Sequence, residues 1–140
     1  MADFDFTMEG ASKLAYNTNS AYGTDCYRAP ELISGTEAIV SMKSDIWALG
    51  CVMYELLSGS RAFPHEGKVR EYYVNAEQEL HPPLPDGITA KSQAYIKTLQ
   101  YWMFGREWWK RPSAGDIVDL LGPVWLLKIL QYSRKILGLN

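Results

Sequence analysis

Residues 44–58 read SDIWALGCVMYELLS and contain the strongest helical pattern in the sequence. Ser44 can cap the first turn, and Gly59 can end the helix because glycine reaches left-handed backbone angles. Apolar residues fall on nearly every face of this helix; they are Ile46, Trp47, Leu49, Val52, Met53, Leu56 and Leu57. A helix that is apolar all round is usually buried on all sides. The stretch therefore predicts a central helix around which the other helices pack.

Other helices are predicted on the C-terminal side of this one. A short helix is expected near residues 69–74, between loops that contain four prolines. Residues 89–104 predict the next helix, with Thr89 as its cap, because apolar residues recur there at spacings of three and four. They are Tyr95, Ile96, Leu99, Trp102 and Met103.

Residues 105–112 (GREWWKRP) interrupt this helical pattern. Ser113 then begins a helix predicted over 114–121, with Asp116 as its partner in a capping box. Residues 1–36 are rich in Thr, Ser, Asn, Gly and Asp and predict a long loop with turns. Since no clear strand pattern occurs, the predicted fold class is mainly α.

Composition places the chain among compact globular domains. Its 140 residues are 47% hydrophobic and 21% charged, and the formal charge is -2, which argues against a nucleic-acid binder. Two cysteines form no disulfide framework and indicate a reducing compartment, so we expect a cytoplasmic or nuclear protein. Residues 1–10 are acidic and do not resemble a signal peptide, and no stretch is apolar for long enough to predict a membrane span.

Three stretches, in this order and spacing, make the sequence similar to the protein kinase family. Residues 23–31 (GTDCYRAPE) match the family's G-T-x-x-Y-x-A-P-E stretch, in which several fixed positions agree at once. Residues 44–51 (SDIWALGC) match the start of its buried helix, and residues 3–5 (DFD) resemble its D-F-G element. Residues 110–113 (KRPS) add a supporting match. The Gly-Thr pair resembles serine/threonine kinases, and the matches cover about residues 1–121.

The resemblance implies a fold and a set of roles. The fold would be the helical C-terminal lobe of a protein kinase, with the N-terminal lobe and the catalytic loop absent. Asp3 would bind Mg²⁺, which bridges the phosphates of ATP, and the partner would be a protein or peptide substrate. The other implied roles are a substrate-binding floor of Gly23, Thr24 and Tyr27, a buried ion pair of Glu31 with Arg111, and an anchor for the catalytic loop at Asp45.

The sequence also departs from the family. The 140 residues contain no Gly-rich phosphate loop, no V-A-I-K-type lysine and no H-R-D-x-x-x-x-N catalytic loop. The general base and the second metal ligand are thus missing, no residue is predicted to be catalytic, and we expect the chain to be inactive by itself. Asp5 stands where the family has glycine, and its carboxylate would either add a metal ligand or repel Asp3.

The predicted loop before Gly23 carries several hydroxyl groups. They belong to Thr7, Ser12, Tyr16, Thr18, Ser20 and Tyr22. Thr18, Ser20 and Tyr22 are the candidate phosphorylation sites, since a phosphate can order a loop through new charge pairs. Ordinary loop polarity explains the same residues, so both interpretations stay open.

Residues 122–140 form a tail beyond the resemblance, whereas residues 1–121 form the partial kinase domain. A helix is predicted over 124–137, with Lys128, Gln131 and Lys135 on one narrow face and apolar residues over most of the rest. A basic amphipathic helix can bind a membrane surface or a partner helix, but packing against its own lobe is favoured here. Similarly, the Trp pair at 108–109 either forms a docking patch or fills the loop between helices.

Three functions remain in competition. The chain could be part of a serine/threonine kinase whose N-terminal half lies on another polypeptide or is missing from the sequence. It could instead be a kinase-derived module that docks proteins without catalysis. The third possibility is a non-functional remnant, because removing the N-terminal lobe would expose apolar surface.

Overall fold

The computed structural model describes residues 16–18, 23–33, 38–74, 81–84 and 86–119. In chain order the elements are β1 (Tyr16–Thr18), 3₁₀ turns at Asp25–Tyr27 and Pro30–Leu32, β2 (Ala38–Val40), α1 (Met42–Ser58), α2 (Glu66–Val69), a π-helical turn at Arg70–Val74, α3 (Ala90–Met103) and a 3₁₀ turn at Trp108–Lys110. Residues 114–119 are also helical. Helices dominate, so the predicted mainly α fold class is confirmed.

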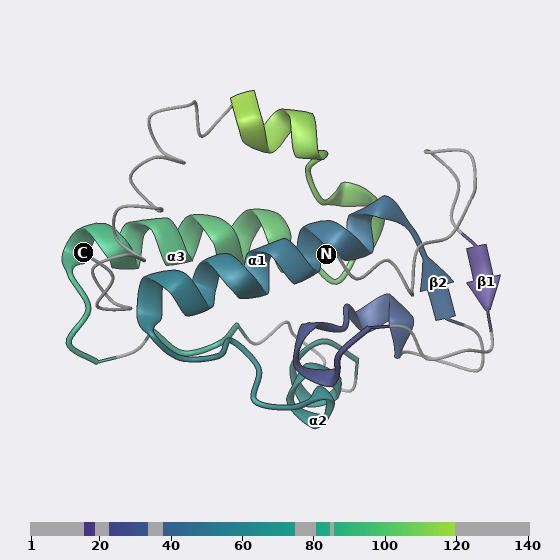
Figure 1. Ribbon diagram of the computed structural model, residues 1–140, viewed down its shortest axis with the longest axis horizontal. Coiled ribbons are helices and arrows are strands. Elements are labelled where there is room, and N and C mark those ends of the chain that lie inside the picture. The colour runs from purple at the N-terminus through teal and green to yellow at the C-terminus, as the bar shows by residue number, and fades with distance from the viewer. Residues whose placement is uncertain (1–15, 19–22, 34–37, 75–80, 85, 120–140) are drawn as a thin grey trace, which may run out of the picture.

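Helix α1 forms the spine of the structure. Figure 1 shows α3 lying alongside α1, with α2 below them and the two strands beyond the N-terminal end of α1. The helix begins earlier than predicted because Ser41 is its N-cap and accepts a hydrogen bond from the Lys43 amide at 3.2 Å. The predicted cap at Ser44 is therefore wrong. Gly59 ends the helix at φ 73°, as predicted, and its N–H bonds the Glu55 carbonyl.

The main core collects aromatic rings around one tryptophan of α1. Trp47 is fully buried and stacks on Phe63 at a centroid distance of 5.2 Å. Tyr73 meets the same indole edge-on at 4.9 Å, and Phe104 lies 5.0 Å away. Offset or edge-to-face pairs of this kind add to the stability that burial alone supplies. One side chain therefore joins α1 to segments that lie far apart in the sequence.

The prediction that α1 is buried on all sides is wrong. Ile46 and Met53 contact Leu99 and Met103 of α3 in a second apolar cluster. By contrast, Met42, Leu49 and Val52 are exposed on the described structure. An apolar residue in a sequence shows only that burial is favourable, and it does not show that another segment covers that face.

The other predicted helices are found with shifted ends. Thr89 caps α3 and accepts a hydrogen bond from the Ser92 amide at 3.2 Å. Ser113 and Asp116 form the predicted capping box, with Ser113 N–H donating to Asp116 Oδ2 at 2.7 Å and Asp116 N–H donating to Ser113 Oγ at 3.1 Å. The helix expected near 69–74 begins earlier, at Glu66, and continues as the π-helical turn.

The loop predicted over residues 1–36 contains regular structure that the sequence pattern did not show. β1 pairs antiparallel with β2, with Tyr16 opposite Val40 and Thr18 opposite Ala38. Both strands have three residues, which is too short for an alternating pattern to be recognised. The predicted helix over 124–137 lies outside the described residues. Within the part of the chain that the structure describes, no helix is long and apolar enough to cross a membrane.

Gly50 allows α1 and α3 to approach closely. A Cβ atom placed on Gly50 would lie 2.9 Å from Phe104 Cε1 and 3.0 Å from Met103 Cβ. These distances are shorter than normal van der Waals contacts, and both neighbours are buried. The packing therefore requires glycine for space and not for an unusual backbone angle.

We expect Gly50→Ala to lower the free energy of unfolding by about 1–3 kcal/mol, because the extra methyl group overpacks a close helix contact. Urea unfolding followed by circular dichroism measures this change. Gly115→Ala is the matched control, since its Cβ would meet only Ser113 Oγ, at 3.6 Å. Equal losses of stability in the two variants would contradict the assignment.

Candidate functional site

Residues 23–33 form two consecutive turns, of which the first contacts α1. Gly23 adopts φ +80°, a left-handed angle that favours glycine. The Tyr27 amide then bonds the Thr24 carbonyl at 2.9 Å, and the Leu32 amide bonds the Ala29 carbonyl at 3.0 Å. Ala29 is fully buried between the two turns. These turns direct the next acidic side chain, Glu31, into the protein.

Glu31 forms a buried, bidentate ion pair with Arg111. Arg111 Nη1 donates to Glu31 Oε1 at 2.8 Å, and Nη2 donates to Oε2 at 2.7 Å. The side chains are only 3% and 0% exposed, although 80 positions separate them in the sequence. The sequence analysis paired these two residues, and the structure places them in direct contact.

The remaining polar atoms of the pair also have partners. Ser44 Oγ donates to Glu31 Oε1 at 2.9 Å. Arg111 Nε donates to the Gly105 carbonyl at 2.9 Å, and Nη1 also donates to the Lys43 carbonyl at 3.0 Å. Lys43 Nζ in turn donates to the Arg111 carbonyl. A buried ion pair is tolerated when such hydrogen bonds satisfy its other atoms, and here they join three segments of the chain.

The guanidinium group also lies against the core tryptophan. Arg111 Cζ is 5.1 Å from the centroid of the Trp47 ring. A desolvated arginine over an indole face gains a favourable cation–π interaction. Lysine has neither the planar fork for a bidentate carboxylate nor the same stacking surface, so this position specifically requires arginine.

Tyr27 and Arg28 fasten the first turn at two further points. Tyr27 Oη donates to Glu55 Oε2 of α1 at 2.9 Å, and this hydrogen bond, together with burial, raises the pKa of the tyrosine. Arg28 Nη1 donates to Glu66 Oε2 of α2 at 2.8 Å, and Nε donates to the Gly23 carbonyl at 2.8 Å. The turn is thereby attached to α1 and to α2.

The sequence did not reveal these two attachments. Glu55 lies 28 positions from Tyr27, and Glu66 lies 38 positions from Arg28. Both acids belong to stretches in which a charged residue also fits an ordinary solvated helix surface. Ser44 was missed in a different way, because its place near the start of a helix suggested a cap and not a bond to Glu31.

The other predicted site residues lie outside the buried ion pair, on the first turn and on α1. Gly23 and Thr24 are exposed at the start of the turns, whereas Tyr27 is half-buried. Asp45 is exposed on the first turn of α1 and forms no hydrogen bond or ion pair with the described residues, while local loss of water raises the pKa of its carboxyl. Asp3 lies outside the described residues.

The candidate phosphorylation sites lie at or beyond the limits of the described chain. The backbone of Thr18 is the last position of β1, opposite Ala38 of β2. Ser20 and Tyr22 lie outside the described residues, as does Asp5. Their roles therefore stay predictions.

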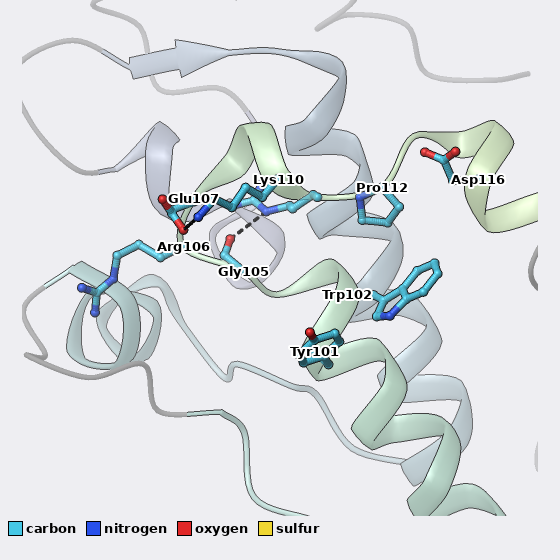
Figure 2. A pocket seen from close by; sticks show the side chains of 9 residues that line it. Tyr101, Trp102, Gly105, Arg106, Glu107, Lys110, Pro112 and Asp116 are labelled. Carbon is cyan, nitrogen blue, oxygen red and sulfur yellow. Dashed lines mark hydrogen bonds and ion pairs between the residues drawn. The ribbon is translucent and has the colours of Figure 1, made fainter.

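A cleft of about 620 Å³ lies beside the loop that carries Arg111. Figure 2 shows Tyr101 and Trp102 on α3 at one side and Asp116 on the next helix at the other. The charged groups on its wall bond within the protein: Lys110 donates to Glu107, and Asp116 accepts from Ser113. These bonds hold the loop and the start of the following helix.

Comparison with known proteins agrees with this geometry. The family model described as the protein kinase domain matches residues 1–121. The chain belongs to the protein kinase family. The buried Glu31–Arg111 pair therefore joins the A-P-E stretch of a protein kinase to the arginine that follows its later helices.

Several curated relatives are protein kinases, and one of them is named as a serine/threonine kinase. The chain is 53% identical over 57 residues, 39% of its length, to the serine/threonine-protein kinase Nek8 of Danio rerio. It is 31% identical over 68% of its length to mitogen-activated protein kinase kinase kinase 19 of Homo sapiens. It is 38% identical over 73% of its length to the mitogen-activated protein kinase kinase kinase MCK1 of Pyricularia oryzae. The chain spans only 7 to 8% of the length of these three relatives.

Protein kinases generally use ATP with Mg²⁺. The described residues of this chain contain no group of three or more His, Cys, Asp or Glu side chains that could hold a metal ion. Asp45 has no other acidic ligand beside it among the described residues, and the carboxylate oxygens of Glu31 accept hydrogen bonds from Arg111 and Ser44. Asp3, the residue that the resemblance assigns to Mg²⁺, lies outside the described residues.

We expect Arg111→Met to lower the free energy of unfolding by about 3–5 kcal/mol, because Glu31 would be left buried without its partner. Chemical denaturation measures the loss. Lys110→Met is the matched control: it removes the neighbouring cation, whose pair with Glu107 is exposed, and little change is expected. The double variant Glu31→Gln/Arg111→Met should recover part of the stability. A small effect of Arg111→Met would contradict the structural role of the pair.

Glu66 should make the stability of the folded protein depend on pH in the acidic range. Burial opposes ionisation of its carboxyl, but hydrogen bonds from Arg28 and Arg70 outweigh it and lower the pKa from the usual 4.5. A lowered pKa in the folded state stabilises the protein above about 4.5, and this stabilisation is lost as the pH falls through the folded-state value.

The stability difference between the natural chain and Glu66→Gln should therefore be largest near neutral pH and shrink in acid. Urea unfolding at several pH values measures it. Glu71→Gln, which removes an exposed partner of Lys68, serves as the comparison. A Glu66→Gln effect that does not vary with pH would show that the ion pairs are not its source.

Proposed function

We propose that this chain supplies the substrate-side platform of a serine/threonine protein kinase. The observation that carries the proposal is the bidentate Glu31–Arg111 pair, which fastens the A-P-E stretch to the helical lobe. Two further attachments, Tyr27 to Glu55 and Arg28 to Glu66, hold the preceding turn. A peptide-docking surface needs such rigid support, because positioning dominates phosphoryl transfer.

Within this proposal each predicted residue has a role. Gly23, Thr24 and Tyr27 shape the floor on which the peptide binds, and the Glu31–Arg111 ion pair holds this floor against the helical lobe. Asp45 anchors the catalytic loop of a kinase, and the absence of a partner for its carboxylate among the described residues is consistent with that use. Asp3 binds Mg²⁺, and Thr18, Ser20 and Tyr22 are the phosphorylation sites that would order the segment before the floor.

We further propose that the 140 residues do not transfer phosphate by themselves. Their sequence contains no phosphate loop, no V-A-I-K-type lysine and no H-R-D-x-x-x-x-N motif. Those elements bind the nucleotide, supply the base and hold the second metal ion. Residues that carry those elements, in the same polypeptide or in another, would complete the active enzyme. Both cysteines are free and buried, in keeping with a cytoplasmic or nuclear location.

The alternative is a docking module without catalysis. The observation that favours it is that the Glu31–Arg111, Tyr27–Glu55 and Arg28–Glu66 bonds all join residues of this chain, so its own side chains hold the platform. Such a module would bind peptides in the same place. The two functions differ in whether a catalytic partner restores phosphoryl transfer.

The first test measures peptide binding and phosphoryl transfer with the purified chain. A fluorescent Ser/Thr peptide mixture should bind, and binding should weaken in Arg111→Met but not in Lys110→Met. Labelled ATP with Mg²⁺ should yield no phosphopeptide, and Mg·ATP should not shift the thermal melting of the chain. Absence of peptide binding would reject the platform. Phosphorylation that disappears in Asp3→Ala would reject the inactivity of the isolated chain.

The second test adds a polypeptide that carries a kinase N-terminal lobe and catalytic loop. Restored phosphoryl transfer would support the role as part of an enzyme. Peptide binding with no transfer after complex formation would favour the docking module.

A further inference from the structure

The described residues enclose a pocket of about 290 Å³ that is lined from the C-terminal half of α1, the loop after it and α2. Tyr54 and Ala62 of its wall are buried, and Tyr54 Oη donates to the carbonyl of Pro83, which also lines it. Tyr72 of the π-helical turn adds a second aromatic wall. We refer to this space as the α1–α2 pocket. Its walls are held in place by buried side chains and by a hydrogen bond.

Two cations line the α1–α2 pocket, and the described residues that line it include no carboxylate. Arg61 is exposed and forms no hydrogen bond or ion pair with another described residue. Lys68 Nζ lies 5.6 Å from the centroid of the Tyr72 ring and 2.7 Å from Glu71 Oε2. Because Glu71 balances the charge of Lys68, the charge of Arg61 stays unbalanced. A ligand group that carries one negative charge would balance it.

The α1–α2 pocket adjoins the proposed floor for the peptide. Glu55 follows Tyr54 in α1 and accepts a hydrogen bond from Tyr27 Oη at 2.9 Å. This bond and burial raise the pKa of Tyr27, and the nearby charge of Arg61 acts in the opposite direction. The bond from Arg28 attaches the same turn to α2, which forms the other side of the pocket. A peptide on the floor therefore has the pocket beside it.

We propose that Arg61 and Lys68 bind a glutamate or aspartate side chain of the peptide that docks on the floor. This inference rests on the proposed function and adds a preference for substrates with an acidic residue near their Ser or Thr. A guanidinium group matches the two oxygens of a carboxylate, and an ammonium group adds a further donor. Apolar atoms of Tyr54 and Ala62 would contact the methylene groups of the ligand. The pocket thus selects one side chain of the substrate by charge and by shape.

The charges of the α1–α2 pocket favour a carboxylate over a phosphate group. A phosphorylated side chain carries a charge of about −1.5 to −2 at neutral pH. That charge exceeds the single unbalanced positive charge, and Glu71 beside Lys68 would repel the excess. A carboxylate carries one negative charge and leaves no excess. The fitting occupant is therefore an acidic residue and not a phosphorylated one.

Binding of matched fluorescent peptides to the purified chain tests the proposal. The peptides contain one Ser and, at successive neighbouring positions, either Glu or Gln. At one or more positions the Glu peptide should bind about fivefold more tightly, which is the gain that a partly exposed ion pair gives. Arg61→Gln should remove this preference, and Lys68→Gln should reduce it. Arg61→Glu should instead favour a peptide with Lys at the same position. The preference for Glu should also shrink at high salt.

Lys97→Gln is the matched control, because Lys97 is an exposed cation of α3 outside the pocket. It should leave the preference unchanged, and thermal melting checks that each variant is folded. Equal binding of the Glu and Gln peptides would overturn the proposal and leave the platform standing. Failure of every peptide to bind would reject the platform and this proposal with it. Tighter binding of a phosphoserine peptide than of the Glu peptide, or equal losses in Arg61→Gln and Lys97→Gln, would also overturn it.

Discussion

The buried pair of Glu31 and Arg111 is the interaction on which the arrangement of this lobe depends. Two ionised side chains that are almost completely removed from water are stable together only if each oxygen and N–H group finds a partner. Ser44, the Lys43 carbonyl and the Gly105 carbonyl supply those partners. The start of α1, the A-P-E turn and the loop after α3 must therefore occupy fixed relative positions.

The aromatic core transmits this constraint to the rest of the structure. Trp47 lies under the guanidinium group on one side and contacts Phe63, Tyr73 and Phe104. Gly50, one turn further along α1, allows α3 to approach closely enough to place Phe104 there. Apolar packing and the ion pair thus stabilise the same geometry, and a substitution in either would disturb the turn that carries Tyr27.

Much of the helical fold could be predicted because the signals are local. The αL glycine at 59, the Thr89 cap and the Ser113–Asp116 box each depend on residues within one turn of one another. The Glu31–Arg111 contact was predicted only through the resemblance to kinases. The two residues are 80 positions apart, and no local sequence pattern shows that such distant residues are in contact. The pairings of Tyr27 with Glu55 and of Arg28 with Glu66 were not predicted, because each acid also suits a solvated helix surface.

The sequence by itself determined the mainly α class, the order of the helices and the kinase family, because periodicity, capping residues and the stretches GTDCYRAPE and SDIWALGC are properties of consecutive residues. Only the tertiary structure decided that Ser44 bonds Glu31, that β1 pairs with β2, and that Met42, Leu49 and Val52 of α1 are exposed. The physical reason is that burial and hydrogen-bond partners depend on which segments meet. An apolar side chain favours burial, but the packing of the segments decides whether another part of the protein covers it.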